Sequence, residues 1–151
     1  MSDQQPVFSI EKIYLKDASI ETPNTPQVFL ESGQPQIEVT LQTGATHVAE
    51  SLFEVVVTGT ITAKAGERTY FLVEAAQAGI FRIQNLPEAD LEPVLAVACA
   101  NIVFPYLRES VADMVARAGF PPIHLVPVNF EGMYAERKQQ AAAAPRIEIA
   151  H

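Results

Sequence analysis

The chain is poor in cysteine and in basic residues, and each shortage narrows the class of protein. It has one cysteine, Cys99, so no intrachain disulfide can form, which fits a reducing compartment. Its 10 Lys and Arg against 18 Asp and Glu give a formal charge of −8 at pH 7, which repels nucleic acid and attracts basic segments. The start lacks a signal segment, and no apolar run approaches the roughly 20 residues of a membrane span. We therefore expect a cytoplasmic protein that binds no nucleic acid and does not insert into membranes.

Groups able to do chemistry are also scarce. The histidines at 47, 124 and 151 have no His or Cys partner at metal-ligand spacing. Cys99 lies in an Ala-rich apolar stretch without a nearby base, and Ser110 is not in a Gly-x-Ser-x-Gly elbow. The seven glycines are scattered rather than gathered in a phosphate loop. The sequence predicts no metal, no cofactor and no enzymatic activity; a pair of converging carboxylates, which counting does not reveal, is the remaining route to catalysis.

The first half of the chain reads as strands and the second half as helices. Alternating apolar residues predict strands over residues 8–15, 36–41, 53–63 and 70–75, with a short hairpin connection at 64–68. The alternation slips between Ile10 and Ile13, as a bulge or sheet crossing would cause. Helical spacing follows over residues 90–100, and Asn129 can cap a final helix. This order predicts a single α+β domain over residues 1–140, followed by a mobile tail at 141–151.

The stretch from Cys99 to Phe130 contains the clearest amphipathic helix. Its apolar residues recur at helical spacing and form one stripe: Leu107, Val111, Met114, Val115 and Ala118. Pro105 suits a first helical turn, and Gly119 suits the left-handed position just past a helix end. An apolar stripe without chemical groups favours binding over catalysis.

Two groups of residues each leave two interpretations open. Four acidic side chains lie on or beside the predicted strands: Asp17, Glu21, Glu54 and Glu74. They form either a solvated sheet face or a flat docking surface for a basic partner, to which Leu72 would add an apolar contact. Taken alone, they favour the solvated face. In the Pro-rich loop at 22–35, Val28, Phe29 and Leu30 either plug the core or wall an exposed groove. The residues alone leave these two nearly balanced.

Several motifs in order resemble SecB, the bacterial protein-export chaperone family, over almost the full chain. They are IYLKD at 13–17, EVV at 54–56, FLVE at 71–74, GIF at 79–81, NIVFPY at 101–106 and PVNF at 127–130. The resemblance implies a four-stranded antiparallel sheet with helices packed on one face, assembled as a dimer of dimers. It also implies an ATP-independent chaperone that holds unfolded secretory precursors in the cytoplasm and delivers them to SecA, the motor of the Sec translocase.

The resemblance also assigns sites, position by position. SecA's basic, zinc-binding C-terminal tail is expected on the acidic sheet face, at Asp17, Glu21, Leu72 and Glu74. The groove for unfolded clients is expected at Val28, Phe29, Ile37, Val39, Leu41, Phe130 and Tyr134. Gly33 stands where family members carry a tryptophan, so that wall of the groove is expected to be either weaker or supplied by Phe29. We expect Gln77 at an oligomer contact, because a long apolar strand there would otherwise leave an exposed edge.

Two alternatives to a SecA-linked export chaperone are considered. The first is a SecB-like chaperone dedicated to a toxin–antitoxin pair, which need not serve SecA, so the acidic docking surface separates it from the leading interpretation. The second is a small-ligand enzyme that uses the groove between sheet and helices. A convergent charged pair in a closed pocket would support the enzyme, whereas an open apolar trough counts against it.

Overall fold

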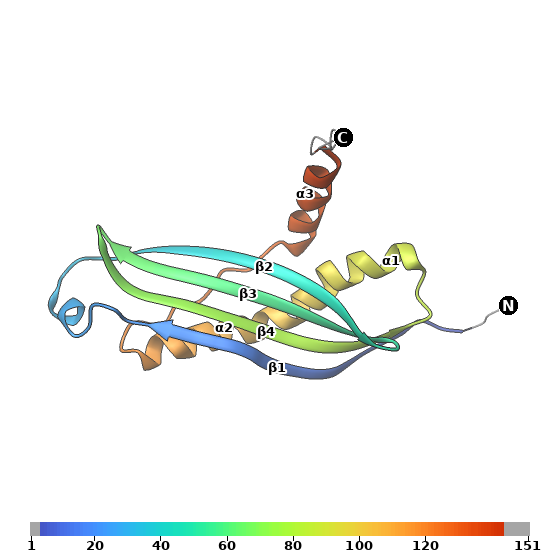
Figure 1. The fold of residues 1–151 in the computed structure, drawn as a ribbon, viewed down its shortest axis with the longest axis horizontal. Helices are drawn as coiled ribbons and strands as arrows, with labels where there is room; N and C mark the ends of the chain where they lie inside the picture. Colours follow the sequence, from blue (N-terminus) through green and yellow to red (C-terminus); the bar gives the residue numbers. More distant parts are fainter. Residues whose placement is uncertain (1–3, 144–151) are drawn as a thin grey trace, which may run out of the picture.

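Four long strands form one antiparallel sheet in the order β1-β4-β3-β2 (Figure 1). The computed structural model describes residues 4–143. The strands are β1 (Val7–Glu21), β2 (Gln36–Ala49), β3 (Leu52–Ala65) and β4 (Arg68–Gln84). All four strands predicted from the sequence are confirmed. Each is longer than predicted, because pairing with neighbours carries it past the end of the apolar alternation.

The central hairpin of β3 and β4 has one apolar and one mostly polar face, as the alternation predicted. Its two-residue turn places Gly66 at φ +64°, a conformation that glycine adopts at little cost. The inward side chains of both strands are buried: Val55, Val57, Ile61, Ala63, Phe71, Val73, Ala75 and Phe81. This face forms the floor of the core.

β1 contains the predicted bulge and a second one. The register shifts between Ile10 and Lys12, and again between Leu15 and Asp17. The first shift brings Ile10 opposite Phe81 and Ile13 opposite Gly79, so both isoleucines face the helices. The bulge thus places on one face the apolar residues that simple alternation would divide between two.

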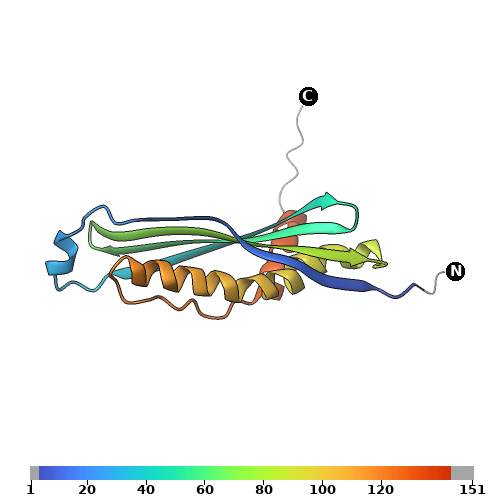
Figure 2. The same ribbon diagram turned by 90° about the horizontal axis from the view of Figure 1, so that it is seen from below.

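One continuous helix covers the inner face of the sheet (Figure 2). It runs through α1 (Glu88–Pro93), a π-helical segment η2 (Val94–Cys99) and α2 (Ala100–Arg117), and Gly119 at φ +97° follows its end. The prediction that Pro105 opens a helix is wrong, since it lies inside α2. Pro105 is exposed, so its ring points to solvent. The helix α2 continues through this position although proline has no backbone N–H to donate.

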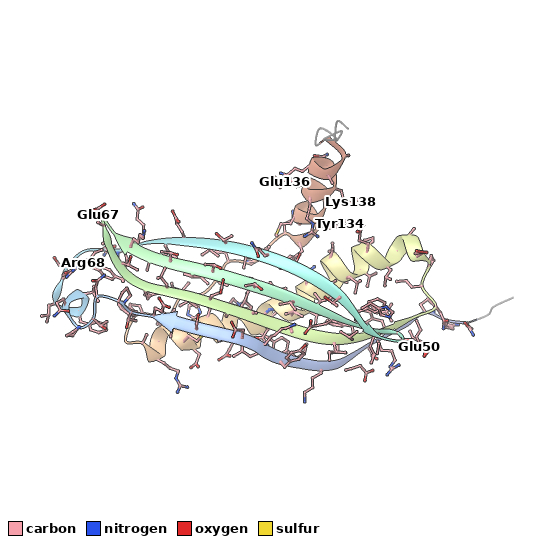
Figure 3. The ribbon with its side chains drawn as sticks, viewed as in Figure 1. Glu50, Glu67, Arg68, Tyr134, Glu136 and Lys138 are labelled. Atoms are coloured by element: carbon pink, nitrogen blue, oxygen red, sulfur yellow. The ribbon has the colours of Figure 1, made fainter. Side chains whose placement is uncertain are left out.

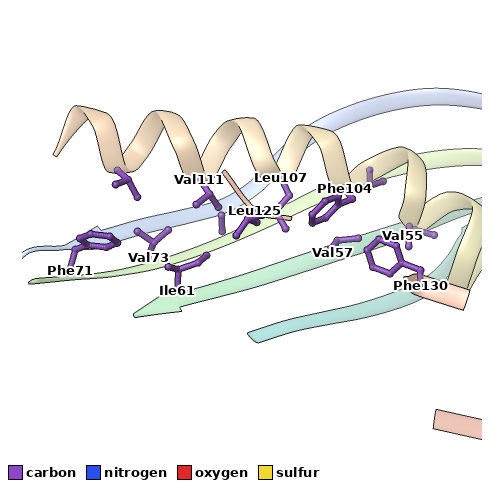
Figure 4. Close-up of a cluster of buried hydrophobic side chains, with 14 of the residues drawn as sticks. Val55, Val57, Ile61, Phe71, Val73, Phe104, Leu107, Val111, Leu125 and Phe130 are labelled. Carbon is purple, nitrogen blue, oxygen red and sulfur yellow. The ribbon is translucent and has the colours of Figure 1, made fainter. Parts of the chain in front are cut away.

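The predicted stripe of α2 packs on the central hairpin (Figure 4). Leu107, Val111 and Val115 are fully buried. Gly59 of β3 permits this close approach, because a Cβ there would lie 3.3 Å from Leu107 Cδ2. The continuous helix Glu88–Arg117 is long and apolar enough to cross a membrane by length and composition alone. Its packing on the sheet accounts for that composition.

The chain after α2 returns along β2 and ends in α3 (Phe130–Ala143), which projects away from the sheet (Figure 1). The Asn129 side chain caps α3 as predicted, since its Oδ1 accepts the Gly132 N–H at 2.9 Å. The helix continues three residues past the predicted domain limit at 140. Residues 144–151, the rest of the predicted tail, lie outside the described part of the chain.

Candidate functional site

The outer face of the sheet, opposite the helices, brings together the four residues predicted to bind SecA. The register of β1 and β4 sets Glu21 opposite Leu72, Ser19 opposite Glu74 and Asp17 opposite Ala76. Cross-strand partners share a face, so three carboxylates and one apolar side chain lie in neighbouring positions on the outer face, with Leu72 at one end and Glu74 in the middle. All four are exposed, with Leu72 36% exposed, and Glu74 Oε2 accepts a bond from the Thr60 hydroxyl at 3.3 Å. We call Asp17, Glu21, Leu72 and Glu74 the acidic face.

Glu54, the fourth acidic position singled out in the sequence, is not part of the acidic face. Its residue is 9% exposed, and its carboxylate accepts bonds from Lys16 Nζ at 2.8 and 2.9 Å and from the Tyr14 hydroxyl. Bonding to Lys16 and Tyr14 lowers the Glu54 pKa, and burial next to Glu54 raises the Tyr14 pKa to about 12. The Glu54 carboxylate is therefore ion-paired with Lys16 and held in place by two side chains of β1. The alternation of apolar and polar residues along β3 does not reveal the partners of Glu54, because Tyr14 and Lys16 lie on β1, two strands away in the sheet.

An open apolar trough lies on the inner side of β2. Ile37, Val39 and Leu41 form one wall, and residues 123–128 form the other, around a hollow of about 360 Å³. Val39 is 45% exposed, and Val126 is 76% exposed. A neighbouring hollow of about 460 Å³ continues from Ile37 toward the loop at 33–35, between Tyr70, Phe71 and residues 120–123. We call Ile37, Val39, Leu41 and Val126 the apolar groove.

The Pro-rich loop plugs the core, which is the first of the two roles that the sequence left open. Its short 3-10 helix η1 (Gln27–Leu30) buries Val28 in the core, where it is 2% exposed. Phe29 instead packs against Phe120, with ring centres 5.0 Å apart, and its ring rests on Gly119. Leu30 is largely exposed beside them. One turn of helix therefore plugs the core with Val28 and leaves Phe29 and Leu30 at the surface, where neither lines the groove.

The structure brings together three of the seven predicted groove residues, Ile37, Val39 and Leu41, whereas Phe29 packs against Phe120 and lines neither hollow. Val28 and Phe130 are each 2% exposed and face the core, where Phe130 packs edge-on against Phe104. Tyr134 lies apart on α3 (Figure 3), where its hydroxyl donates to Glu92 Oε1 at 2.8 Å. Val126 was not predicted, since a valine between prolines carries no periodic signal.

The reasoning that placed Gln77 at an exposed edge is wrong. β4 lies between β1 and β3, so both of its edges are paired. Gln77 points toward the helix and is buried, and its Oε1 accepts the Ser110 hydroxyl at 3.0 Å. Strand order is a long-range property that alternation along β4 does not contain.

Groups capable of catalysis are engaged elsewhere or isolated. Ser110 is bonded to Gln77, and burial raises the pKa of the Cys99 thiol to about 12. Within residues 4–143, no three His, Cys, Asp or Glu side chains are grouped so that they could hold a metal ion. An exposed acidic face and an open apolar groove on one fold are features typical of a binding protein.

Known proteins identify the family. The family described as "Preprotein translocase subunit SecB" matches residues 1–141. "Protein-export protein SecB" of Dechloromonas aromatica is 62% identical over 95% of this chain and 94% of its own length. The protein of the same name from Methylibium petroleiphilum is 55% identical over 93% of this chain and 86% of its own length. The chain belongs to the SecB family, and it is a protein-export chaperone rather than an enzyme.

A solved structure supports the fold independently. A SecB-like chaperone of Mycobacterium tuberculosis, in complex with a peptide from an antitoxin, matches with a TM-score of 0.68 at 17% identity. The match covers 80% of this chain and 90% of that one. The likeness confirms the four-stranded sheet with helices on one face. The much closer relatives named for protein export favour that function over a role dedicated to a toxin–antitoxin pair.

Proposed function

We propose that this chain is an ATP-independent, cytoplasmic chaperone that holds unfolded secretory precursors in the apolar groove and passes them to SecA through the acidic face. The observation that carries the proposal is the placement of the two surfaces. The groove lies on the inner side of β2 at one edge of the sheet, and the acidic face lies on the outer side of β1 and β4 at the other. Both partners can therefore be bound at once.

The groove suits extended apolar segments of varied sequence. Ile37, Val39 and Leu41 alternate along one side of β2 and give a row of shallow contacts instead of one deep, shaped pocket. Binding of this kind gains about 25 cal/mol per Å² of apolar surface buried, less the cost of ordering the client. Hydrolysis of a nucleotide is not needed for such binding, since release follows from the loss of shallow contacts.

The acidic face suits a short basic segment such as the zinc-binding C-terminal tail of SecA. Asp17, Glu21 and Glu74 supply negative charge, and Leu72, opposite Glu21 at one end of the row, supplies an apolar contact that favours a folded tail over free cations. The formal charge of −8 steers a basic partner to the whole protein, and the acidic face selects where it binds.

A homotetramer, as a dimer of dimers, accounts for apolar surface that one chain leaves uncovered. β1 pairs only with β4, so its other edge is free along most of its length. Phe8, Ile10 and Leu15 face the helix side of β1 yet are 44% to 49% exposed. A long edge strand with apolar neighbours is a template for pairing with a second copy. Several grooves in one assembly would hold one long precursor more firmly than a single groove.

Three measurements on the purified protein test this function. Refolding of a denatured secretory precursor should slow in proportion to added protein, without ATP. Isothermal titration should show binding of the zinc-loaded C-terminal peptide of SecA, and native mass spectrometry should give four 16.5 kDa chains. A monomer that neither slows refolding nor binds the peptide would contradict the proposal.

A further inference from the structure

The second bulge of β1 decides which face Asp17 and Glu21 occupy. Leu15 lies opposite Gln77 and Asp17 lies opposite Ala76, so Lys16 is one extra residue in β1 with no partner in the ladder. One extra residue moves every later side chain to the other face of a sheet. With regular alternation from Leu15 onward, both carboxylates would face the helices. The acidic face exists because β1 bulges at Lys16.

The bulged residue is anchored across the sheet rather than left in solvent. Lys16 Nζ lies 2.8 and 2.9 Å from the two carboxylate oxygens of Glu54, which belongs to β3, and the Tyr14 hydroxyl donates to the same carboxylate. The contacts pass over β4, where Ala78 is fully buried although its neighbour along the outer row, Ala76, is not. Lys16 is half exposed, whereas Glu54 is almost entirely covered. The bulge is therefore tied to the rigid central hairpin at a fixed point.

We propose that Lys16, Glu54 and Tyr14 are positioning residues for SecA binding: they hold the bulge in place and thereby keep Asp17 and Glu21 on the acidic face beside Leu72 and Glu74. This inference rests on the proposed function of the acidic face. None of the three needs to touch the SecA tail. Their contribution is to prevent β1 from shifting its register, which would turn two of the three carboxylates inward.

The first bulge of β1 is a natural control within the same strand. Glu11 is the extra residue there, between Ile10 and Lys12, and its carboxylate is bonded to Arg82 at 3.2 Å and to Ser9 at 2.9 Å. It is also an ion-paired bulge on the same strand. It lies near the start of β1, however, remote from the acidic face. Breaking this pair removes the same kind of interaction without loosening residues 17–21.

Lys16→Met separates positioning from a direct effect of charge. Lys16 is a cation beside an acidic surface, so by charge alone its removal should tighten binding of a basic peptide. A positioning role predicts the opposite. We expect the dissociation constant for the zinc-loaded SecA C-terminal peptide to rise about fivefold. Lys16→Arg retains the charge and the pair, and should bind as the parent does.

A charge-neutral pair of variants completes the experiment. Lys16→Met with Glu54→Gln leaves the net charge unchanged and should still weaken peptide binding about fivefold. Backbone amides of residues 17–21 should exchange hydrogen faster than in the parent. Arg82→Met with Glu11→Gln, also charge-neutral, should leave peptide affinity within twofold and exchange at 17–21 unchanged. Slowing of precursor refolding should be the same in all variants, because the apolar groove is untouched.

The outcomes distinguish the inference from the function on which it rests. Tighter or unchanged peptide binding by Lys16→Met, with binding lost in Glu74→Lys, would overturn the positioning role and leave the acidic face as the SecA site. Equal weakening by both charge-neutral pairs would also overturn it, since general destabilisation would then explain the loss. Unchanged binding by Glu74→Lys would remove the acidic face itself as the SecA site, and the positioning role with it.

Discussion

The two sides of this sheet hold different kinds of exposed surface, and different strands build them. On the inner side, apolar side chains of β2 stay uncovered beside the returning segment at 123–128 and form an open groove. On the outer side, β1 and β4 place three carboxylates on the same face as Leu72. The inner surface follows from simple alternation, whereas the outer one needs an irregularity, the bulge at Lys16. A sheet can thus offer an adaptable surface and a specific one if its edge strand breaks alternation at a defined residue.

The largest expected difference between the faces comes from Glu74→Lys. A cation in the centre of the acidic face repels a basic peptide, and like-charge contacts cost several kcal/mol. We expect SecA-peptide affinity to fall by at least about tenfold, or 1.4 kcal/mol, in isothermal titration, with precursor binding unchanged. Glu50→Lys, at the tip of the β2–β3 hairpin (Figure 3), makes the same change of charge away from the face and should behave as the parent. Equal losses in both variants would mean that net charge, not the acidic face, determines binding.

The reciprocal change is Val39→Asp in the apolar groove. It removes apolar contact area and places a carboxylate where a client would cover it, which should weaken precursor binding by about 1 to 2 kcal/mol. Val48→Asp is a matched control, since Val48 is on the same strand and 49% exposed but outside the groove. Refolding of a denatured precursor measures the effect. If Val48→Asp impairs the chaperone as strongly, clients bind elsewhere on β2.

Salt should weaken binding at the acidic face but not at the apolar groove. Raising ionic strength from about 0.1 M to 1 M shortens the screening length from roughly 10 to 3 Å, which weakens attraction between exposed charges. Affinity for the SecA peptide should fall several-fold, whereas precursor binding should hold or strengthen, as apolar contacts do. Fluorescence anisotropy with labelled peptide and labelled unfolded precursor gives both values. A parallel fall of the two would show that clients are also held mainly by charge.

The smallest effect concerns the stability of the outer face and its pH dependence. The Glu54 pKa is lowered in the folded state by Lys16 and Tyr14, so its stabilisation is complete above the unfolded value of about 4.3 and is lost as pH falls through the folded value. Glu54→Gln should cost about 1 kcal/mol of unfolding free energy at pH 7. That difference should shrink steadily below pH 4. Urea unfolding of the parent and of Glu54→Gln at pH 7 and below pH 4 measures this difference in stability. A difference that does not change with pH would show that the carboxylate is not charged in this contact.

Local patterns predicted the parts of this fold whose determinants lie close together in sequence. The hairpin of β3 and β4, the stripe of α2 and the cap at Asn129 follow from periodicity and turn chemistry. The prediction that Pro105 opens a helix failed because a helix can continue through a proline whose ring lies on its exposed side. The burial of Val28 and Phe130 and the position of Gln77 depend on how distant segments meet.

The acidic face could not be predicted from local sequence patterns alone. Asp17 and Glu21 gain their orientation from Lys16, and nothing in the spacing of IYLKD shows that its fourth residue is a bulge. The family resemblance named four residues that the structure places on one face, whereas the residues alone favoured a solvated sheet. Glu54 stood in the same row by alternation, yet its contacts with Tyr14 and Lys16 remove it from the surface.

Simultaneous binding tests the separation of the two faces most directly. The affinity of the zinc-loaded SecA peptide should be measured for the free protein and again with an unfolded precursor at saturation. Because the apolar groove and the acidic face lie on opposite sides of the sheet, we predict dissociation constants within twofold of each other and a ternary complex in native mass spectrometry. Displacement of the peptide by precursor, or of precursor by peptide, would contradict the separation of the two surfaces.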